Sequence, residues 1–261
     1  MRLFFLLLSC ITHGFVFATD DVDLNIYFES DYRPYTFLTG GKIDGINGIL
    51  IKEACQRANL RCNFLPMPWN RAMASVLKDP KGGLLSAART SARAPFFRWA
   101  GPMVSSTAYY FKLKERTDIS IESQDDVLNY TIGVNRNDIY ESVLLARGFV
   151  IGKNLLQTSS KDDSIRLFLL GRLDLMIGSA FTMQGALDKF GKSLDTVEAV
   201  VPLYTPEIKG NYLATNLQVS DSIINALNTA MLEYRQTAEF NALIQRFRPK
   251  DLVLPDSIVK F

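Results

Sequence analysis

Short apolar runs alternate with longer amphipathic segments along most of this chain. The runs at 24–28 and 83–88 are short and apolar, which predicts buried strands. Segment 47–60 instead repeats apolar residues at three- and four-residue steps, which predicts a helix with one buried face. The full pattern predicts strands at 24–28, 62–65, 83–88, 109–113, 131–134 and 173–177, and helices at 47–60, 71–77, 139–147, 162–171, 180–190, 222–234 and 240–247. Strands that alternate with helices indicate parallel sheets, so the expected fold class is α/β.

The N-terminus has the pattern of a secretory signal peptide. Met1-Arg2 carries positive charge, residues 3–16 are mostly apolar, and Val16-Phe17-Ala18 offers a cleavage site after Ala18. We therefore expect residues 1–18 to be removed and the mature protein to be periplasmic. An uncleaved anchor helix and a lipid anchor on Cys10 are the alternatives. The apolar run is shorter than the roughly 20 residues that span a bilayer.

Loss of this leader would remove the only histidine, His13, and one of the three cysteines, Cys10. Without histidine, the mature chain cannot form Ser-His-Asp or Cys-His catalytic sets, and the usual zinc sites lack ligands. There is no glycine loop of the phosphate-cradling type. A net charge of +2 gives no reason to expect nucleic acid. We expect no metal, no cofactor and no nucleic-acid partner.

The two remaining cysteines, Cys55 and Cys62, lie where a helix is expected to end and a strand to begin. An oxidising compartment favours a disulfide between them. Two buried free thiols are the alternative. A bridge here would be a structural link without a redox role.

A series of short motifs follows in a fixed order along the mature chain. They are Tyr32-Arg33-Pro34-Tyr35-Thr36-Phe37, Gly45-Ile46-Asn47-Gly48-Ile49-Leu50, Pro68-Trp69, Thr90-Ser91-Ala92-Arg93, Trp99-Ala100-Gly101-Pro102 and Gly171-Arg172-Leu173-Asp174. In this order they resemble periplasmic solute-binding proteins of family 3, the polar amino-acid-binding type with a transporter substrate-binding domain. Some members also have a disulfide that resembles Cys55–Cys62. Ile49 departs from the pattern, because an acidic residue is usual there.

The resemblance implies a two-lobed, type II periplasmic-binding-protein fold. Each lobe would be a small, mostly parallel sheet flanked by helices, and two strands would form the hinge. Lobe I would comprise residues 19–107 with 208–261, and lobe II residues 108–207. The ligand would lie between the lobes.

Arg93 is the expected anchor for a ligand carboxylate, because a guanidinium matches a carboxylate with two parallel hydrogen bonds. The family places its carboxylate clamp at this motif position. The resemblance also implies aromatic walls from Tyr32 and Trp69 and an acid, Glu29, for the ligand side chain. Further donors beside Arg93 would come from Ser86, Thr90 and the backbone at Ala88. The alternatives are a surface arginine, two core aromatics and a solvated carboxylate.

Lobe II departs from the family pattern. The family acid that pairs with a ligand ammonium falls at Ser179, and a serine cannot neutralise a cation. Asp138 replaces part of the usual Gly-Thr sequence, in Asn137-Asp138-Ile139; a helix cap and a ligand contact are both open for it. Arg136 faces either the cleft or solvent. Either Asp138 or Glu29 therefore accepts the ammonium, or the solute is not a standard α-amino acid.

These expectations describe a monomeric receptor that captures a small carboxylate-bearing solute by hinge closure, without catalysis. Its partner would be an importer of the ABC type or a membrane sensor. One alternative is an enzyme on the same scaffold, such as a dehydratase of a cyclic carboxylate, with Glu29 or Asp138 as the acid. A structural, partner-docking protein is another.

Overall fold

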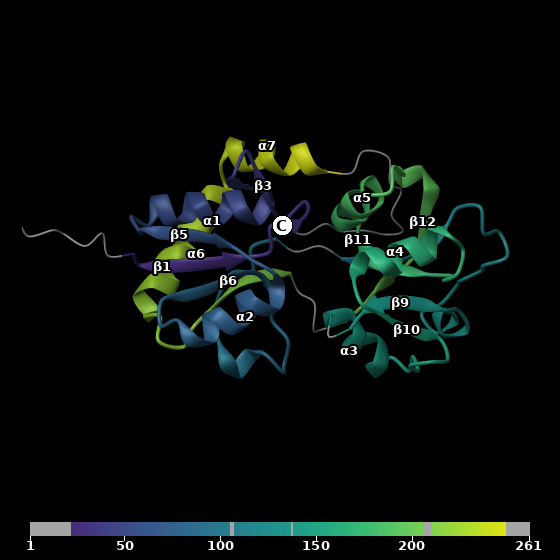
Figure 1. The fold of residues 1–261 in the computed structure, drawn as a ribbon. Helices are drawn as coiled ribbons and strands as arrows, with labels where there is room; N and C mark the ends of the chain where they lie inside the picture. Colours follow the sequence, from purple (N-terminus) through teal and green to yellow (C-terminus); the bar gives the residue numbers. More distant parts are fainter. Residues whose placement is uncertain (1–21, 105–106, 137, 206–209, 249–261) are drawn as a thin grey trace, which may run out of the picture.

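The computed structural model describes residues 22–104, 107–136, 138–205 and 210–248, which form two α/β lobes side by side (Figure 1). Lobe I contains β1 (Leu24–Phe28), β2 (Asp31–Tyr32), β3 (Thr36–Thr39), β4 (Lys42–Asp44), α1 (Ile46–Arg57), β5 (Cys62–Pro66), α2 (Trp69–Lys78), β6 (Gly82–Ala88), η1 (Ala94–Phe96), β7 (Arg98–Ala100), β13 (Asn211–Thr215), α6 (Asp221–Arg235) and α7 (Ala238–Phe247). Lobe II contains β8 (Ala108–Leu113), η2 (Asp126–Asn129), β9 (Ile132–Asn135), α3 (Ile139–Ala146), β10 (Leu155–Thr158), α4 (Lys161–Leu169), β11 (Met176–Ser179), α5 (Ala180–Asp188), η3 (Leu194–Thr196) and β12 (Val197–Leu203).

The sheet of lobe I has the order β5-β1-β6-β13-β7. β1 pairs in parallel with β5 and β6, while β13 is antiparallel to both β6 and β7. A small antiparallel sheet of β2, β3 and β4 precedes α1. The parallel strands expected from the sequence are thus present, and β13 adds an antiparallel strand because the chain returns from lobe II.

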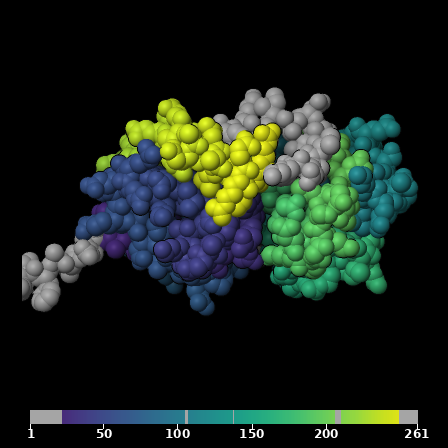
Figure 2. Space-filling model, turned by 90° about the horizontal axis from the view of Figure 1, so that it is seen from above, coloured from purple at the N-terminus to yellow at the C-terminus, as the bar shows by residue number. Residues whose placement is uncertain are grey.

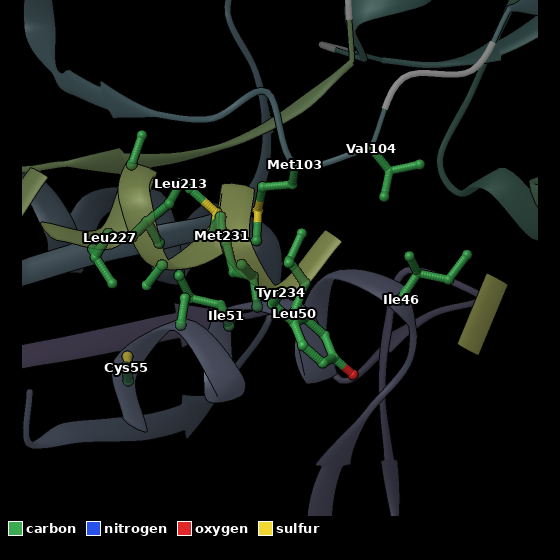
Figure 3. Packing of buried hydrophobic residues seen from close by; sticks show 14 of the residues in the cluster. Ile46, Leu50, Ile51, Cys55, Met103, Val104, Leu213, Leu227, Met231 and Tyr234 are labelled. Atoms are coloured by element: carbon green, nitrogen blue, oxygen red, sulfur yellow. The ribbon is translucent and has the colours of Figure 1, made fainter. Parts of the chain in front are cut away.

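The core of lobe I forms where α1 and α6 pack against each other (Figure 3). Leu50 and Ile51 of α1 meet Leu227, Met231 and Tyr234 of α6, and all of them are almost completely buried. The three- and four-residue spacing read from the sequence is what places these side chains on one face of each helix. This apolar core gives lobe I a rigid body on which the site residues can be held.

The predicted disulfide is confirmed. Cys55 lies near the end of α1 and Cys62 begins β5, and their sulfur atoms are bonded at 2.08 Å. The bridge therefore links a helix of lobe I to the edge strand of its sheet.

Lobe II is also a mixed structure. β8 lies between β11 and β12 and is antiparallel to both, while β9 and β10 form a parallel pair. An isolated parallel bridge between Ile132 and Leu175 connects the two groups of strands. The predicted strand at 173–177 is displaced, since β11 occupies Met176–Ser179.

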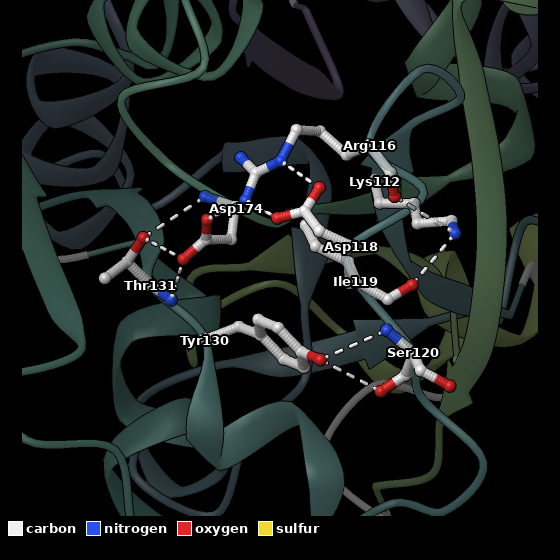
Figure 4. Close-up of polar contacts among 8 residues, drawn as sticks. All are labelled: Lys112, Arg116, Asp118, Ile119, Ser120, Tyr130, Thr131 and Asp174. Carbon is white, nitrogen blue, oxygen red and sulfur yellow. Dashed lines mark hydrogen bonds and ion pairs between the residues drawn. The ribbon is translucent and has the colours of Figure 1, made fainter.

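The motif residue Asp174 accounts for this displacement (Figure 4). Its carboxylate accepts hydrogen bonds from the backbone nitrogen and hydroxyl of Thr131, at 2.8 and 2.7 Å, and from Arg116 at 3.0 Å. Asp174 therefore holds the segment before β11 against the segment before β9, and the strand begins only after this contact.

The chain crosses between the lobes twice, once between β7 and β8 and once between β12 and β13. Figure 2 shows lobe I, in purple, blue and yellow, directly against the green part of lobe II. The predicted leader 1–18, with Cys10, and the predicted lobe boundary at 207/208 lie outside the described residues. Within those residues, no helix combines the length and hydropathy needed to cross a bilayer.

Candidate functional site

A cavity of about 590 Å³ lies between the two lobes. Its wall includes the ends of β6, β9 and β11, the start of α3, and residues around β2 and α2. All of the predicted ligand residues except Thr90 line it: Glu29, Tyr32, Trp69, Ser86, Ala88, Arg93, Asp138 and Ser179. The sequence therefore identified residues that the fold brings together from both lobes, while their contact with a solute stays a prediction.

Arg93 reaches the cavity from the turn after β6. Thr90, which is buried, shapes this turn: its carbonyl accepts from the backbone nitrogens of Arg93 and Ala94, at 3.0 and 2.8 Å. Its hydroxyl accepts from the Arg93 backbone nitrogen at 3.2 Å. Thr90 thus positions Arg93 instead of facing the cavity.

The guanidinium of Arg93 is half-buried and lies over the indole of Trp69, 5.6 Å from the ring centroid. Its one hydrogen bond to a described residue is a long one, 3.5 Å, to the carbonyl of Ala88. Burial lowers the pKa of Arg93, and the charge of Asp138 across the cavity partly opposes that effect. The group stays cationic at neutral pH and retains donors for an anion.

Ser86 has a left-handed backbone conformation, with φ of 63°. Its buried hydroxyl accepts from the Asn47 side chain at 2.9 Å and lies 3.3 Å from the Thr36 hydroxyl. The side chain is therefore engaged within lobe I, and the unusual backbone lies where the register between β6 and β13 shifts.

Aromatic rings form much of the remaining wall. Tyr32 lies against Tyr35, with ring centroids 5.3 Å apart, and Tyr140 of α3 faces them from lobe II. Burial raises the pKa of Tyr32 and of Tyr140 well above the ordinary value, and the nearby Asp138 charge acts in the same direction. Both phenols are therefore neutral hydrogen-bond donors across the physiological pH range. Tyr35 and Tyr140 also line the cavity, and neither was predicted from the sequence, although Tyr35 belongs to the first motif.

Asp138 is the N-cap of α3, as the first of its two interpretations predicted. One carboxylate oxygen accepts from the Tyr140 backbone nitrogen at 3.0 Å, and the other lies 3.6 Å from Lys161. The neighbouring Asn137 lies outside the described residues. Arg136 lines the cavity, with its side chain exposed.

Ser179 is only 4% exposed and caps α5 through a reciprocal pair of bonds with Thr182. Its hydroxyl also lies 3.2 Å from the hydroxyl of Tyr35 in lobe I. Ser179 thus contributes to a contact between the lobes at the position where the family carries an acid.

Other contacts cross the same boundary beside the cavity. Lys189 lies 3.0 Å from Asp31, and the ammonium of Lys161 lies 5.0 Å from the centroid of the Tyr32 ring. Phe181 of α5 is buried within the apolar cluster of lobe I and contacts Tyr35. The lobes therefore touch along α5 while the cavity remains between them.

The sequence matches the bacterial extracellular solute-binding proteins, family 3, over residues 24–250. The chain belongs to this family. The resemblance seen in the motifs is confirmed, and the protein is a solute-binding protein of this type. No curated protein matches the sequence.

Solved structures confirm the two-lobed fold. A histidine kinase sensor domain similar to periplasmic binding proteins has a TM-score of 0.71 at 17% identity, over 86% of this chain and 95% of its own. An ancestral arginine-binding protein bound to arginine has a TM-score of 0.69 at 15% identity, over 86% and 97%. A third match is a periplasmic binding protein of the His/Glu/Gln/Arg/opine family from Silicibacter pomeroyi in complex with lysine. Its TM-score is 0.66 at 16% identity, and the match covers 89% of this chain and 100% of that one. At these identities the likeness concerns the fold alone.

Proposed function

We propose that this protein is a periplasmic receptor that binds a small carboxylate-bearing solute between its lobes and presents the closed form to a membrane partner. The observation that carries the proposal is the guanidinium of Arg93, which lines the cavity and forms no ion pair with any described residue. A half-buried cation with unused donors favours an anionic ligand, because a carboxylate would satisfy those donors and offset the cost of burial.

Because the site residues are divided between lobe I and lobe II, the two lobes would close around the solute. Lobe I would hold the carboxylate through Arg93, with Trp69 and Tyr32 excluding water around it. Lobe II would then add α3 and the end of β9 to the polar shell. The solute can favour the closed form only to the extent that it binds that form more tightly than the open one.

The partner would be an importer permease or a sensor. Both types of system are represented among proteins of similar fold, in an ABC-transporter substrate-binding protein and a histidine kinase sensor domain. The proposed role is binding without turnover, and the receptor would act as a monomer.

The test is a thermal-shift screen of residues 19–261 against amino acids, dicarboxylates, opines and small peptides, followed by calorimetry on each hit. Arg93→Ala should weaken binding of a hit by about tenfold or more, as loss of a charge-assisted bidentate pair implies. Arg89→Ala is the matched control, since Arg89 is exposed on the same segment and does not line the cavity. Equal affinities for Arg93→Ala and the parent would refute the anchor.

A further inference from the structure

The charged side chains on the cavity wall fall into two groups. Most of them are paired with one another: Asp31 with Arg33 and Lys189, Asp162 with Lys189, and Asp138 with Lys161. Charges that neutralise each other in this way have little left to offer a solute.

Three groups on the wall have no such partner. Among the described residues, the guanidinium of Arg93 has a long hydrogen bond to the Ala88 carbonyl and lies over the Trp69 ring, without an ion pair. Within the residues that the structure describes, the side chains of Arg136 and Glu29 make neither a hydrogen bond nor an ion pair. The unused charges of the cavity are therefore two guanidiniums, on opposite lobes, and one carboxylate in lobe I.

Lobe II offers no free acid to a ligand cation in the part of the wall that is described. Ser179 is neutral and its hydroxyl is used by Thr182 and Tyr35. Asp138 uses one oxygen to cap α3 and directs the other toward Lys161. The charged lobe II residues on this wall are three cations, Arg136, Lys161 and Lys189, and two carboxylates, Asp138 and Asp162, so the unpaired Arg136 leaves this side with a net positive charge.

We propose that the solute is a small dicarboxylate, with one carboxylate on Arg93 of lobe I and the second on Arg136 of lobe II. This inference rests on the proposed receptor function and specifies its ligand. A carboxylate at each end of the solute would bind a guanidinium on each lobe. Two such pairs stabilise the closed form more than a single carboxylate does. Glu29, beside Tyr32, would accept an amine when the dicarboxylate carries one.

The discriminating experiment is calorimetry of residues 19–261 with matched probes. L-Glutamate and L-glutamine differ only in the second carboxylate, glutarate lacks the amine of glutamate, and L-arginine and L-lysine place a cation at the far end. A series of dicarboxylates from malonate to adipate varies the distance between the two carboxylates. We expect a dicarboxylate to bind at least about tenfold more tightly than glutamine, arginine or lysine, the gain expected of one charge-assisted pair.

The residue test uses Arg136→Gln, with Arg172→Gln as the matched control because Arg172 is exposed on lobe II and does not line the cavity. Arg136→Gln should weaken the dicarboxylate by about tenfold and leave the binding of monocarboxylates nearly unchanged. Glu29→Gln should weaken glutamate more than glutarate.

The outcomes separate the two proposals. Glutamine, arginine or lysine could bind at least as tightly as every dicarboxylate, with binding that depends on Arg93. That result would overturn the dicarboxylate assignment and leave the receptor function standing. Dicarboxylate binding that Arg136→Gln does not weaken would overturn the role of Arg136. Binding of no carboxylate at all would overturn both proposals.

Discussion

Asp138 uses its two carboxylate oxygens for different contacts, a helix cap and an approach to Lys161. From the sequence, its cap and ligand roles were equally open, because an Asp before an apolar helix fits either. The structure shows the cap. The ion pair involves a lysine whose side chain is 53% exposed, so it contributes little to stability.

The cap can be separated from the charge by two substitutions. Asp138→Ala should lower the free energy of unfolding by about 1 kcal/mol, because the Tyr140 backbone nitrogen loses its acceptor. Asp138→Asn should stay close to the parent, since Asn caps helices about as well as Asp. Urea denaturation measures both. If the two variants lose the same stability, the carboxylate charge, and not the cap, is the important feature.

Asp174 is a motif residue whose role is structural. Its three hydrogen bonds hold the pKa of its carboxyl below the ordinary value even though burial alone would raise it. A group with a lowered pKa in the folded state stabilises the protein above its unfolded pKa of about 4. That contribution is lost as the pH falls from there through the lowered folded-state pKa.

Asp174→Asn should therefore cost about 1–3 kcal/mol at neutral pH, through lost charge-assisted bonds to Thr131 and Arg116. The difference from the parent should shrink as the pH falls below about 4. Denaturation at a series of pH values measures this. Asp125→Asn, at an exposed carboxylate without a side-chain cap bond, is the control and should show neither effect. A pH-independent difference would contradict the assigned role.

At the scale of elements, the periodic pattern located the α-helices and the strands β1, β5, β6, β8, β9 and β11, with β1 at its predicted bounds. It failed where tertiary contacts decide the boundary. β11 begins three residues later than predicted because Asp174 is held by Thr131 and Arg116. The strands β2, β3, β4, β7 and β10 were missed, since two to four residues are too few for a period to show. The longer strands β12 and β13 were missed as well.

The disulfide joins two elements that the pattern had placed correctly. Replacing both Cys55 and Cys62 by Ser should lower the free energy of unfolding by about 2–3 kcal/mol, because the closed loop of the unfolded chain is released. Chemical denaturation under oxidising and reducing conditions measures the loss. The double variant should match the reduced parent. A variant as stable as the oxidised parent would show that the bridge does not constrain the unfolded chain.

The whole molecule depends on the contact between lobes along α5. Phe181 belongs to lobe II by its helix, yet it is 4% exposed and packs in the core of lobe I. Nothing in the sequence separated this residue from the other apolar positions of α5. The contact holds the two lobes together on one side of the cavity.

Phe181→Ala should loosen this contact, so that the open form becomes more populated and the radius of gyration increases. Small-angle scattering of the ligand-free protein measures the change. Phe190→Ala is the matched control, because Phe190 packs against an apolar cluster within lobe II and should alter stability without opening the lobes. An unchanged radius of gyration for Phe181→Ala would show that other contacts hold the lobes together.

Local chemistry in the sequence determined the helices, part of the strands, the disulfide and the family motifs, because helix period, short apolar runs and cysteine placement depend on neighbours along the chain. The sequence also predicted Arg93 as a cavity residue, because Arg93 lies at a fixed position in the motif Thr90-Ser91-Ala92-Arg93. Only the tertiary structure decided which charges remain unpaired. Arg136 and Asp138 are near neighbours in sequence, yet the side chain of Arg136 lines the cavity without a partner among the described residues, while Asp138 caps α3 and approaches Lys161. Pairing depends on distances between segments that fold together, and those distances have no local signal in the sequence.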